Sequence, residues 1–325
     1  MEIRKFMKAQ SSSSEPSGVE LTNPEYLAFG DIGVDSPVLV NHLPRPDEKL
    51  WVEVVADCPG GMAANAAATY ASLGGSAGLV SRVGRDDHGR IALLGLEARR
   101  VNVVQVEEVD EPTFWTLSLA TPDGQRALVQ FPTHAFGPRW DALDFSIIHG
   151  SSVVHSLAEQ GPPVVELMAA ARAADVATSL DIEYPFVARA NLESLVSLVD
   201  MVFLNSEAAQ YLDADPERAA IRVREMGAGT VAVTLGADGA VLADREGTVQ
   251  RIRGERVDAL DANGAGDAFA AAFAWARVRE WPDLHAAEFA NCVAAVATTR
   301  QCWDALGDRE EIRALAGDRS WRSKL

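Results

Sequence analysis

The chain of 325 residues is long enough for one large domain with an appendage or for two domains. Its 47 acidic and 29 basic residues give a net charge of −18, so we expect neither nucleic acid nor an anionic membrane as a partner. The four lysines lie outside the sequence contexts of a Walker A loop, a protein kinase or a Schiff-base enzyme, which excludes those classes.

In chain order, the first half predicts strands over 26–34, 50–56 and 77–84, helices over 61–73 and 87–99, and a hairpin over 113–131 with its turn at 122–124. The second half predicts strands over 145–150, 176–182, 200–205, 230–236 and 239–244, and helices over 162–174, 189–199, 265–279 and 284–299. This alternation predicts an α/β fold, with a mainly parallel sheet covered by helices on both faces. The strands over 50–56 and 113–131 alternate apolar and polar residues, so we expect them to form a small β appendage.

The chain ends and the cysteines indicate in which cell compartment we expect the protein. Residues 1–20 lack the apolar core of a signal peptide and predict a disordered tail. No stretch reaches the roughly 20 apolar residues that a membrane span needs. Cys58, Cys292 and Cys302 lie far apart, with neither a metal-binding spacing nor a disulfide framework. We therefore expect a cytoplasmic protein without a disulfide.

The segment "DANGAGDAFAAAF" combines a glycine-rich turn with an apolar helix. Gly264, Ala265 and Gly266 have little or no side chain, so an anion could approach the backbone N–H groups at the helix start. Asp267 in the first turn would lie beside that anion and could accept a proton from an attacking hydroxyl. The pattern also fits a structural turn that caps a helix. It is not the dinucleotide motif GxGxxG, because Phe269 occupies the third glycine position, and this disfavours an NAD-dependent enzyme.

Two further segments place polar groups where a ligand could bind. Gly60 and Gly61 lead into an alanine-rich helix whose first polar side chain is Asn65, either a hydrogen-bond partner for a polyol or an amide in a polar gap. A buried strand ends in Asp35, preceded by Asp31, and the carboxyl end of a parallel strand would face a ligand crevice. The segment "VTLGADGAVL" is by itself most simply a hairpin.

Together and in this order, "GGMAAN…SLGG…SRVGRDDHG" and "DANGAGDAFAAAF" resemble the two signatures of the pfkB (ribokinase-like) family of carbohydrate and nucleoside kinases. The resemblance implies a three-layer ribokinase-like fold with a β lid, and ATP-dependent phosphorylation of a hydroxyl with Mg²⁺. It places the catalytic base at Asp267, and the anion hole at Gly264, Ala265 and Gly266. It implies substrate contacts at Asp35, Gly60, Gly61 and Asn65, and nucleotide contacts at Asn205, Thr234, Gly236, Gly239 and Asn291. It also implies a monovalent-cation loop, for K⁺, at Asp261.

The resemblance also implies a domain layout: a tail over 1–20, a kinase domain over 21–315 with lid segments at about 35–60 and 107–131, and a tail over 316–325. The lid would close over the substrate and join a homodimer. One departure concerns the family's N-x-x-E motif, since this chain reads "NSEA" from Asn205 and has Ala208 at the acid position. Glu207 lies one residue earlier and could serve Mg²⁺ through water.

The acceptor stays open at the level of sequence. "DIEYPF" lacks the arginine that sugar-acid kinases tend to carry there, so the leading expectation is a primary hydroxyl of a neutral sugar. Asn263 gives the form DxNGAGD, which adenosine-kinase-like members share, and this keeps a nucleoside acceptor open; Ala208 keeps a catalytically silent ligand-binding protein open. Arg45, Lys49 and Arg126 could meet an anionic group, and Trp51, Phe114 and Trp115 could stack on a sugar or fill the lid core.

Overall fold

The computed structural model describes residues 23–325 except 55, 122–125, 185 and 189–190. Its main feature is a nine-stranded sheet in the order β14-β13-β12-β11-β10-β9-β1-β5-β6. All neighbouring strands from β12 to β6 pair in parallel, whereas β13 pairs antiparallel with both β12 and β14. The strands are β1 (Tyr26–Phe29), β5 (Ala77–Gly84), β6 (Val106–Val109), β9 (Val153–Leu157), β10 (Ala177–Ile182), β11 (Met201–Asn205), β12 (Thr230–Thr234), β13 (Gly239–Ala243) and β14 (Val249–Arg253).

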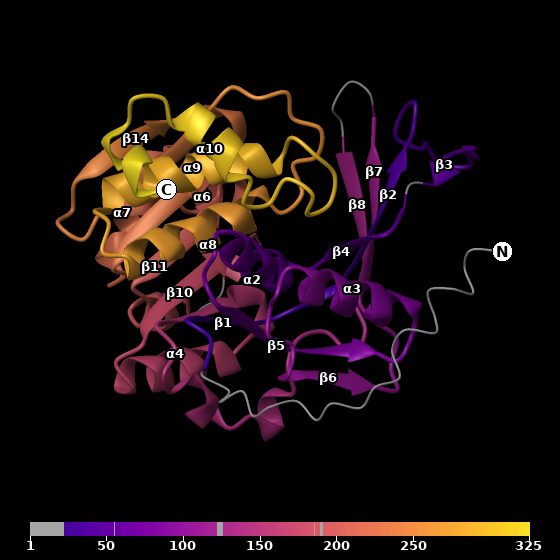
Figure 1. Cartoon of the computed structure of the whole chain (residues 1–325), viewed down its shortest axis with the longest axis horizontal. Helices are drawn as coiled ribbons and strands as arrows, with labels where there is room; N and C mark the ends of the chain where they lie inside the picture. The colour runs from indigo at the N-terminus through magenta and orange to yellow at the C-terminus, as the bar shows by residue number, and fades with distance from the viewer. Residues whose placement is uncertain (1–22, 55, 122–125, 185, 189–190) are drawn as a thin grey trace, which may run out of the picture.

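Helices cover both faces of this sheet (Figure 1). They are α2 (Met62–Ser72), α3 (Asp87–Ala98), α4 (Pro163–Ala173), α5 (Leu192–Val196), α6 (Ser206–Leu212), α7 (Pro216–Glu225), α8 (Ala265–Val278), α9 (Asp283–Ala297) and α10 (Arg309–Ala316). One core cluster joins the sheet to α2, α8 and α9, and a second joins it to α4 through α7. Helix α8 is buried from Asp267 to Ala276, as its apolar sequence predicts. The predicted three-layer α/β/α fold is confirmed.

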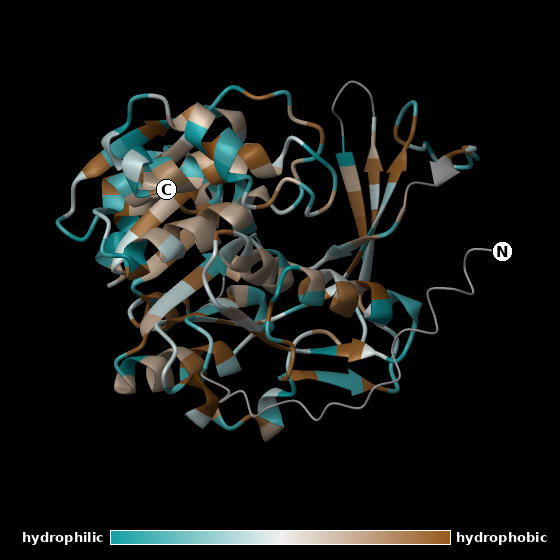
Figure 2. Ribbon diagram, viewed as in Figure 1, coloured by the Kyte–Doolittle hydropathy of each residue, from teal (hydrophilic) through white to brown (hydrophobic). Residues whose placement is uncertain are grey.

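A second, five-stranded sheet projects from the main body beside α2 and α3 (Figure 1). Its strands are β2 (Gly33–Leu39), β3 (Glu53–Val54), β4 (Cys58–Gly60), β7 (Trp115–Ala120) and β8 (Arg126–Phe131). We call this sheet the lid. The predicted turn of its hairpin, at 122–124, lies outside the described residues. Figure 2 shows hydrophobic residues along the lid strands, and Leu39, Val129 and Phe131 are exposed.

The structure corrects several predicted elements. Residues 145–148 form a short 3-10 helix rather than a strand, because Asp144 accepts a hydrogen bond from the Ser146 N–H at 2.9 Å. The strand beside β1 is instead β9, whose five residues are all buried. Of the described residues in the strand expected over 50–56, Glu53–Val54 are the ones found in a strand. Residues 106–109 pair with β5, so the second lid segment begins at β7.

The end of the chain is packed rather than a free tail. Trp321, within the segment 316–325, is 1% exposed, and its indole N–H donates to Glu288 on α9 at 2.8 Å. An aromatic ring of this size buries a large apolar area, which fixes the segment against the helical layer. No helix in the described part of the chain is both long and apolar enough to cross a membrane.

The prediction that the cysteines form no disulfide is wrong. Cys58 and Cys302 are 244 residues apart in sequence, yet they are joined by a disulfide with a Cα–Cα distance of 5.4 Å. The bridge ties β4, at the base of the lid, to the segment that follows α9. Cys292 is free and buried. Because a disulfide is unusual in a reducing cytosol, the cysteines no longer support a cytoplasmic location.

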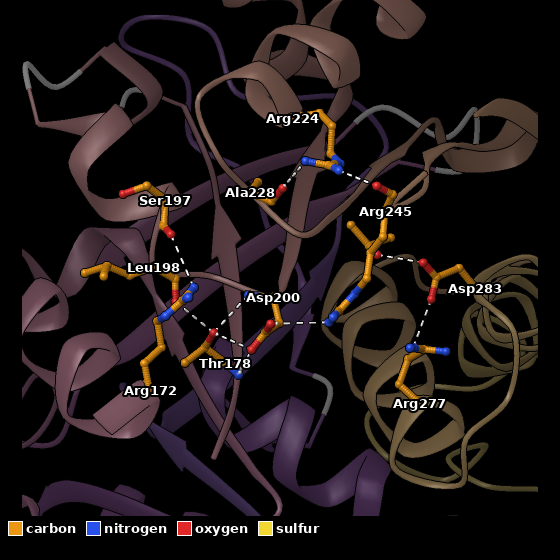
Figure 3. A network of polar contacts seen from close by, with 11 residues as sticks. Arg172, Thr178, Ser197, Leu198, Asp200, Arg224, Ala228, Arg245, Arg277 and Asp283 are labelled. Carbon is orange, nitrogen blue, oxygen red and sulfur yellow. Dashed lines mark hydrogen bonds and ion pairs between the residues drawn. The ribbon is translucent and has the colours of Figure 1, made fainter. Parts of the chain in front are cut away.

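Polar side chains link the strands at the amino-terminal edge of the sheet (Figure 3). Asp200, just before β11, accepts hydrogen bonds at 3.0 Å from both the N–H and the hydroxyl of Thr178. Its other oxygen lies 3.3 Å from the Arg245 guanidinium. Asp283 likewise accepts from the Thr230 hydroxyl at 2.7 Å and pairs with Arg277 at 2.9 Å. The acids of this edge are therefore matched with cations and donors.

Candidate active site

A cavity of about 1210 Å³ lies where the carboxyl ends of the parallel strands meet the start of α8 and the lid. It is lined by the ends of β1, β9, β10, β11 and β12, by residues 262–267, and by one face of β8. Parallel strands bring side chains distant in sequence to one edge, which is where ligands bind in open α/β sheets. Most of the site residues predicted from the sequence line this cavity.

Asp267 lies in the first turn of α8, at the cavity wall, and is 6% exposed. Burial raises the pKa of its carboxyl well above the usual range, and the nearby charges of Asp181, Glu183 and Asp31 raise it further. A hydrogen bond from the Asn65 amide to Oδ2, at 2.8 Å, lowers the pKa and favours the carboxylate. A buried carboxylate with a raised pKa is a stronger base than an exposed one, which suits proton removal from a hydroxyl.

The turn before Asp267 leaves backbone N–H groups open to the cavity. Gly264 caps the helix in the left-handed conformation, at φ 74°, and a Cβ there would lie 3.1 Å from the Asn65 amide nitrogen. The Ala265 N–H donates to the Ala262 carbonyl at 3.4 Å, but no acceptor in the described residues takes the N–H of Gly266 or Asp267. A Cβ on Gly266 would meet nothing within 4 Å. This arrangement can receive an anion.

On the acceptor side, Asp35, Gly61 and Asn65 line the cavity. Gly60 does not line it, but it pairs in the β2–β4 ladder, where a Cβ would lie 2.6 Å from Asp35 Oδ2. Burial, together with the charges of Asp31 and Asp261, raises the pKa of Asp35 to about 7, while Thr116 and Arg126 lower it. Gly60 therefore makes room for Asp35 rather than facing a ligand.

The five predicted nucleotide residues all line the same cavity: Asn205, Thr234, Gly236, Gly239 and Asn291. Asn205 caps α6 by accepting from the Ala208 N–H at 2.8 Å, and its amide donates to Glu183 at 3.2 Å. Asn291 donates to the Arg253 carbonyl at 2.9 Å, which holds α9 against β14. The predicted nucleotide residues thus come from β11, β12, β13, α9 and the turn between β12 and β13, and they meet in one cavity.

The two predicted metal residues lie outside the cavity lining. Glu207 is exposed on α6. Asp261 accepts a hydrogen bond from the Asn263 N–H at 2.9 Å, so its loop closes on itself. No group of three or more His, Cys, Asp or Glu side chains that could hold a metal ion occurs within residues 23–325 where they are described. A divalent ion here would need most of its ligands from phosphate and water.

Sequence reasoning missed three cavity acids that follow or end parallel strands: Glu159, Asp181 and Glu183. Burial, then the charge of Glu183, raises the pKa of Asp181 to about 7. Burial also raises the pKa of Glu159, whose Oε2 has no hydrogen-bond partner in the described residues. All three follow or end strands β9 and β10, so their position at carboxyl ends was the available signal. A sugar brings several hydroxyl donors that such carboxyl groups can accept.

The lid contributes Arg126 to the cavity, where its guanidinium donates to the Asn263 side-chain oxygen at 2.5 Å. Phe114 also lines the cavity and packs edge-on against Phe136. Trp115 instead stacks on Phe131 within the lid, with ring centroids 4.0 Å apart. Arg45, Lys49 and Trp51 are outside the lining, so of the lid groups considered from sequence only Arg126 and Phe114 reach the cavity.

The family model for pfkB family carbohydrate kinases matches residues 39–302. The chain belongs to the pfkB family. It is therefore a carbohydrate kinase, an ATP-dependent phosphotransferase acting on a sugar, as the two sequence signatures predicted. The match spans both signatures, the lid strands from β3 to β8 and the cavity residues described above from Gly61 to Asn291.

Individual relatives agree with this membership. The ATP-dependent ribose-1-phosphate kinase of Halopiger xanaduensis is 29% identical over 297 residues, which cover 90% of this chain and 98% of the relative. The structure of Arabidopsis thaliana ribokinase complexed with ribose and ATP has a TM-score of 0.76 at 22% identity, covering 90% of this chain and 99% of that one. A putative ribokinase II from E. coli, in complex with ATP and Mg²⁺, gives 0.76 at 21%, covering 90% and 98%. These structural matches support the fold.

Proposed function

We propose that this kinase transfers the γ-phosphoryl group of ATP to a primary hydroxyl of a small sugar, with Asp267 as the general base. One observation carries the proposal: Asp267 is buried at the start of α8 and lines a single cavity together with Asp35, Asn65 and the predicted nucleotide residues. A sugar hydroxyl and the γ-phosphoryl group of ATP, both bound in this cavity, could therefore meet beside its carboxylate.

The reaction needs one proton transfer and one displacement. Asp267 accepts the hydroxyl proton while the sugar oxygen forms a bond to the γ-phosphorus, and the bond to the ADP oxygen breaks. The N–H groups of the turn from Gly264 to Gly266 would donate to the phosphoryl oxygens, on which negative charge is spread. Asp35 and Asn65 would hold the sugar in place, and closure of the lid would exclude water as a competing acceptor.

The donor set fits Mg²⁺ brought in with ATP, because this ion is commonly held by phosphates, waters and one or two carboxylates. When bound, Mg²⁺ neutralises charge on the β- and γ-phosphates. Glu183, hydrogen-bonded to Asn205, is the carboxylate on the nucleotide side, whereas the earlier prediction, Glu207, is exposed. A K⁺ site in the loop at Asp261 stays a prediction from the family resemblance.

The experiment is ADP release from MgATP with K⁺ across neutral sugars, sugar phosphates, sugar acids and nucleosides, with Asp267→Asn as control. We expect a single strong sugar acceptor whose turnover is lost in the variant. A nucleoside as the best acceptor would replace the sugar assignment. ATP binding without ADP release for any acceptor would favour the alternative, a catalytically silent ligand-binding protein. This alternative was suggested by Ala208, which stands where the family motif has an acid.

A phosphorylated sugar is a second candidate acceptor, and a specific observation favours it. Arg126 on the lid lines the cavity beside Asn263, where its charge could pair with a phosphate. The Halopiger relative is a ribose-1-phosphate kinase. If Arg126→Gln raises KM for a sugar phosphate about tenfold or more, as loss of a charge-assisted bond predicts, while KM for a neutral sugar is unchanged, this candidate replaces the first.

The lid also supports a proposal about assembly. Strand β8 is at the edge of the five-stranded sheet, and its Val129 and Phe131 are exposed, as is Leu39 on β2. An exposed apolar strand edge is a common docking surface, so we propose a homodimer formed through the lid. The cytoplasmic location, the absence of nucleic-acid or membrane partners and the start of the domain at about 21 stay predictions from the sequence.

A further inference from the structure

Trp303, in the segment after α9, does not line the cavity but contacts a residue that does. It is 6% exposed, and its indole N–H donates to Asn65 Oδ1 at 2.8 Å, although the two residues are 238 positions apart. The amide nitrogen of the same Asn65 donates to Asp267 Oδ2 at 2.8 Å. An unbroken chain of hydrogen bonds therefore runs from Trp303 through Asn65 to Asp267.

The chemistry of the indole fixes the direction of this chain. An indole N–H only donates, so the Asn65 atom that faces it must be the oxygen. The amide nitrogen must then face Asp267, and because it too only donates, Asp267 Oδ2 is the acceptor. Flipping the amide would place two donors together at Trp303 and two acceptors together at Asp267. Trp303 thus selects one of the two amide orientations.

The selected orientation matters because the rest of the surroundings oppose a charge on Asp267. The titratable groups that interact with it come from the ends of β1, β9 and β10 and their loops: Tyr26, Asp31, Glu159, Asp181 and Glu183. Burial and these acids raise the pKa of Asp267, and the Asn65 bond is the contact that lowers it. Losing that donor, or replacing it by the amide oxygen, would leave the base protonated over a wider pH range.

The segment that carries Trp303 is itself held in place. The adjacent Cys302 is bonded to Cys58 on β4, two residues before the glycine pair that starts α2. Arg300 pairs with Asp308 at 3.6 Å and with Glu311 at 2.5 Å, which fixes the segment to α10. A donor anchored on both sides can hold the Asn65 amide at little further entropic cost.

We propose that Trp303 is a positioning residue: its indole N–H holds the Asn65 amide so that the amide nitrogen always faces Asp267, which keeps the base ready to accept the substrate proton. This inference rests on the proposed role of Asp267 as the base. It assigns a role to a residue outside the cavity lining, and the sequence itself contains no signal for it.

The test is the pH dependence of kcat/KM in Trp303→Phe, which keeps an aromatic ring but has no N–H. Trp321→Phe is the matched control, because Trp321 is also buried and donates to Glu288, and neither residue lines the cavity. We expect the acid limb to move to higher pH by about half a unit to one unit in Trp303→Phe, since one unit corresponds to about 1.4 kcal/mol. The rate on the alkaline plateau stays within about threefold, because the base itself is intact.

A merely structural role would give a different pattern. It would lower the rate at every pH without moving the acid limb, or Trp321→Phe would move the limb equally, and either result overturns the proposal. In an Asn65→Ala background, Trp303→Phe should add no further shift, because the chain is already broken. If Asp267→Asn retains turnover, the base assignment fails; if it loses turnover and the limb stays fixed in Trp303→Phe, only the positioning role fails.

A measurement on the unaltered active site covers the case in which Trp303→Phe does not fold. The indole N–H resonance of Trp303 should shift as Asp267 titrates, because the two are linked through one amide. The same resonance in Asp267→Asn should be constant over that pH range. A resonance that is constant in the unsubstituted protein while Asp267 titrates would overturn the proposal.

Discussion

The acidic side chains at the two edges of the central sheet differ in the partners that they have. At the amino-terminal edge, Asp200 and Asp283 each have an arginine and a threonine hydroxyl as partners. At the carboxyl-terminal edge, Asp31, Asp181 and Asp267 are buried, and no ion pair reaches them from the described residues. An acid paired with a cation stabilises a fold, whereas an unpaired buried acid costs stability and is kept for chemistry. The comparison therefore separates scaffold from active site.

The largest expected contrast is in turnover. Asp267→Asn should lower kcat by about a thousandfold, within the range typical for loss of a general base, and leave ATP affinity nearly unchanged. Asp200→Asn, at the opposite edge, should leave kcat within about threefold, because no reacting group contacts it. Steady-state kinetics and ATP-binding calorimetry on both variants provide the check. Equal losses in the two variants would erase the distinction between the edges.

A second contrast concerns the covalent link beside the carboxyl edge. Reductant should lower the free energy of unfolding by about 2–5 kcal/mol, because the Cys58–Cys302 bridge constrains a long loop. Cys302→Ser should show no such dependence on reductant, and Cys292→Ser, which changes the free cysteine, should retain it. Denaturant titrations with and without reductant measure the difference. The same response to reductant in Cys302→Ser and the unsubstituted protein would show that the bridge does not form in solution.

The third contrast is in pH-dependent stability. Asp181 has a pKa raised to about 7, so the unfolded chain loses this proton near pH 4 and the folded chain only near pH 7. Ionisation therefore costs stability as pH rises through that window, and the full cost, on the order of 4 kcal/mol, is reached above pH 7. Asp181→Asn should remove much of this cost, so that its gain in stability grows from pH 4 to pH 8.

The matched variant at the other edge should change stability in the opposite direction. Asp200→Asn leaves Arg245 without its partner and weakens the bonds to Thr178, so we expect a loss of about 1–3 kcal/mol. Denaturant titrations at pH 5 and pH 8.5 measure both variants. If the free energy of unfolding depends on pH with the same slope in Asp181→Asn and in the unsubstituted protein, the Asp181 carboxyl is not the group whose ionisation costs stability.

The smallest expected contrast is between Glu183 and Glu207, the two carboxylates that could support Mg²⁺. Glu183→Gln should raise the Mg²⁺ concentration for half-maximal rate about tenfold, as loss of a supporting polar partner does at other metal sites. Glu207→Gln should change it by less than about twofold, because Glu207 is exposed outside the cavity and is screened by water. The reverse order would restore the role predicted for Glu207 from its position next to Ala208.

Local patterns that depend only on neighbouring residues were predictable from the sequence. Strand β5 has the predicted bounds, and α2, α3 and α8 agree within about two residues at each end, the usual uncertainty of helix ends. The segment 145–150 was not predictable in this way. Its apolar residues suit a strand, but the place beside β1 goes to Val153–Leu157, whose side chains are buried on both faces.

The sequence by itself determined the family, the α/β order of elements and many of the residues that line the cavity with Asp267, because each depends on short motifs or on hydrophobic period. Only the tertiary structure decided that Cys58 meets Cys302, that Glu159 and Asp181 share the cavity, and that Trp303 donates to Asn65. These contacts join residues far apart in the chain. Their distances follow from how the sheet and helices pack, and spacing along a sequence does not encode them.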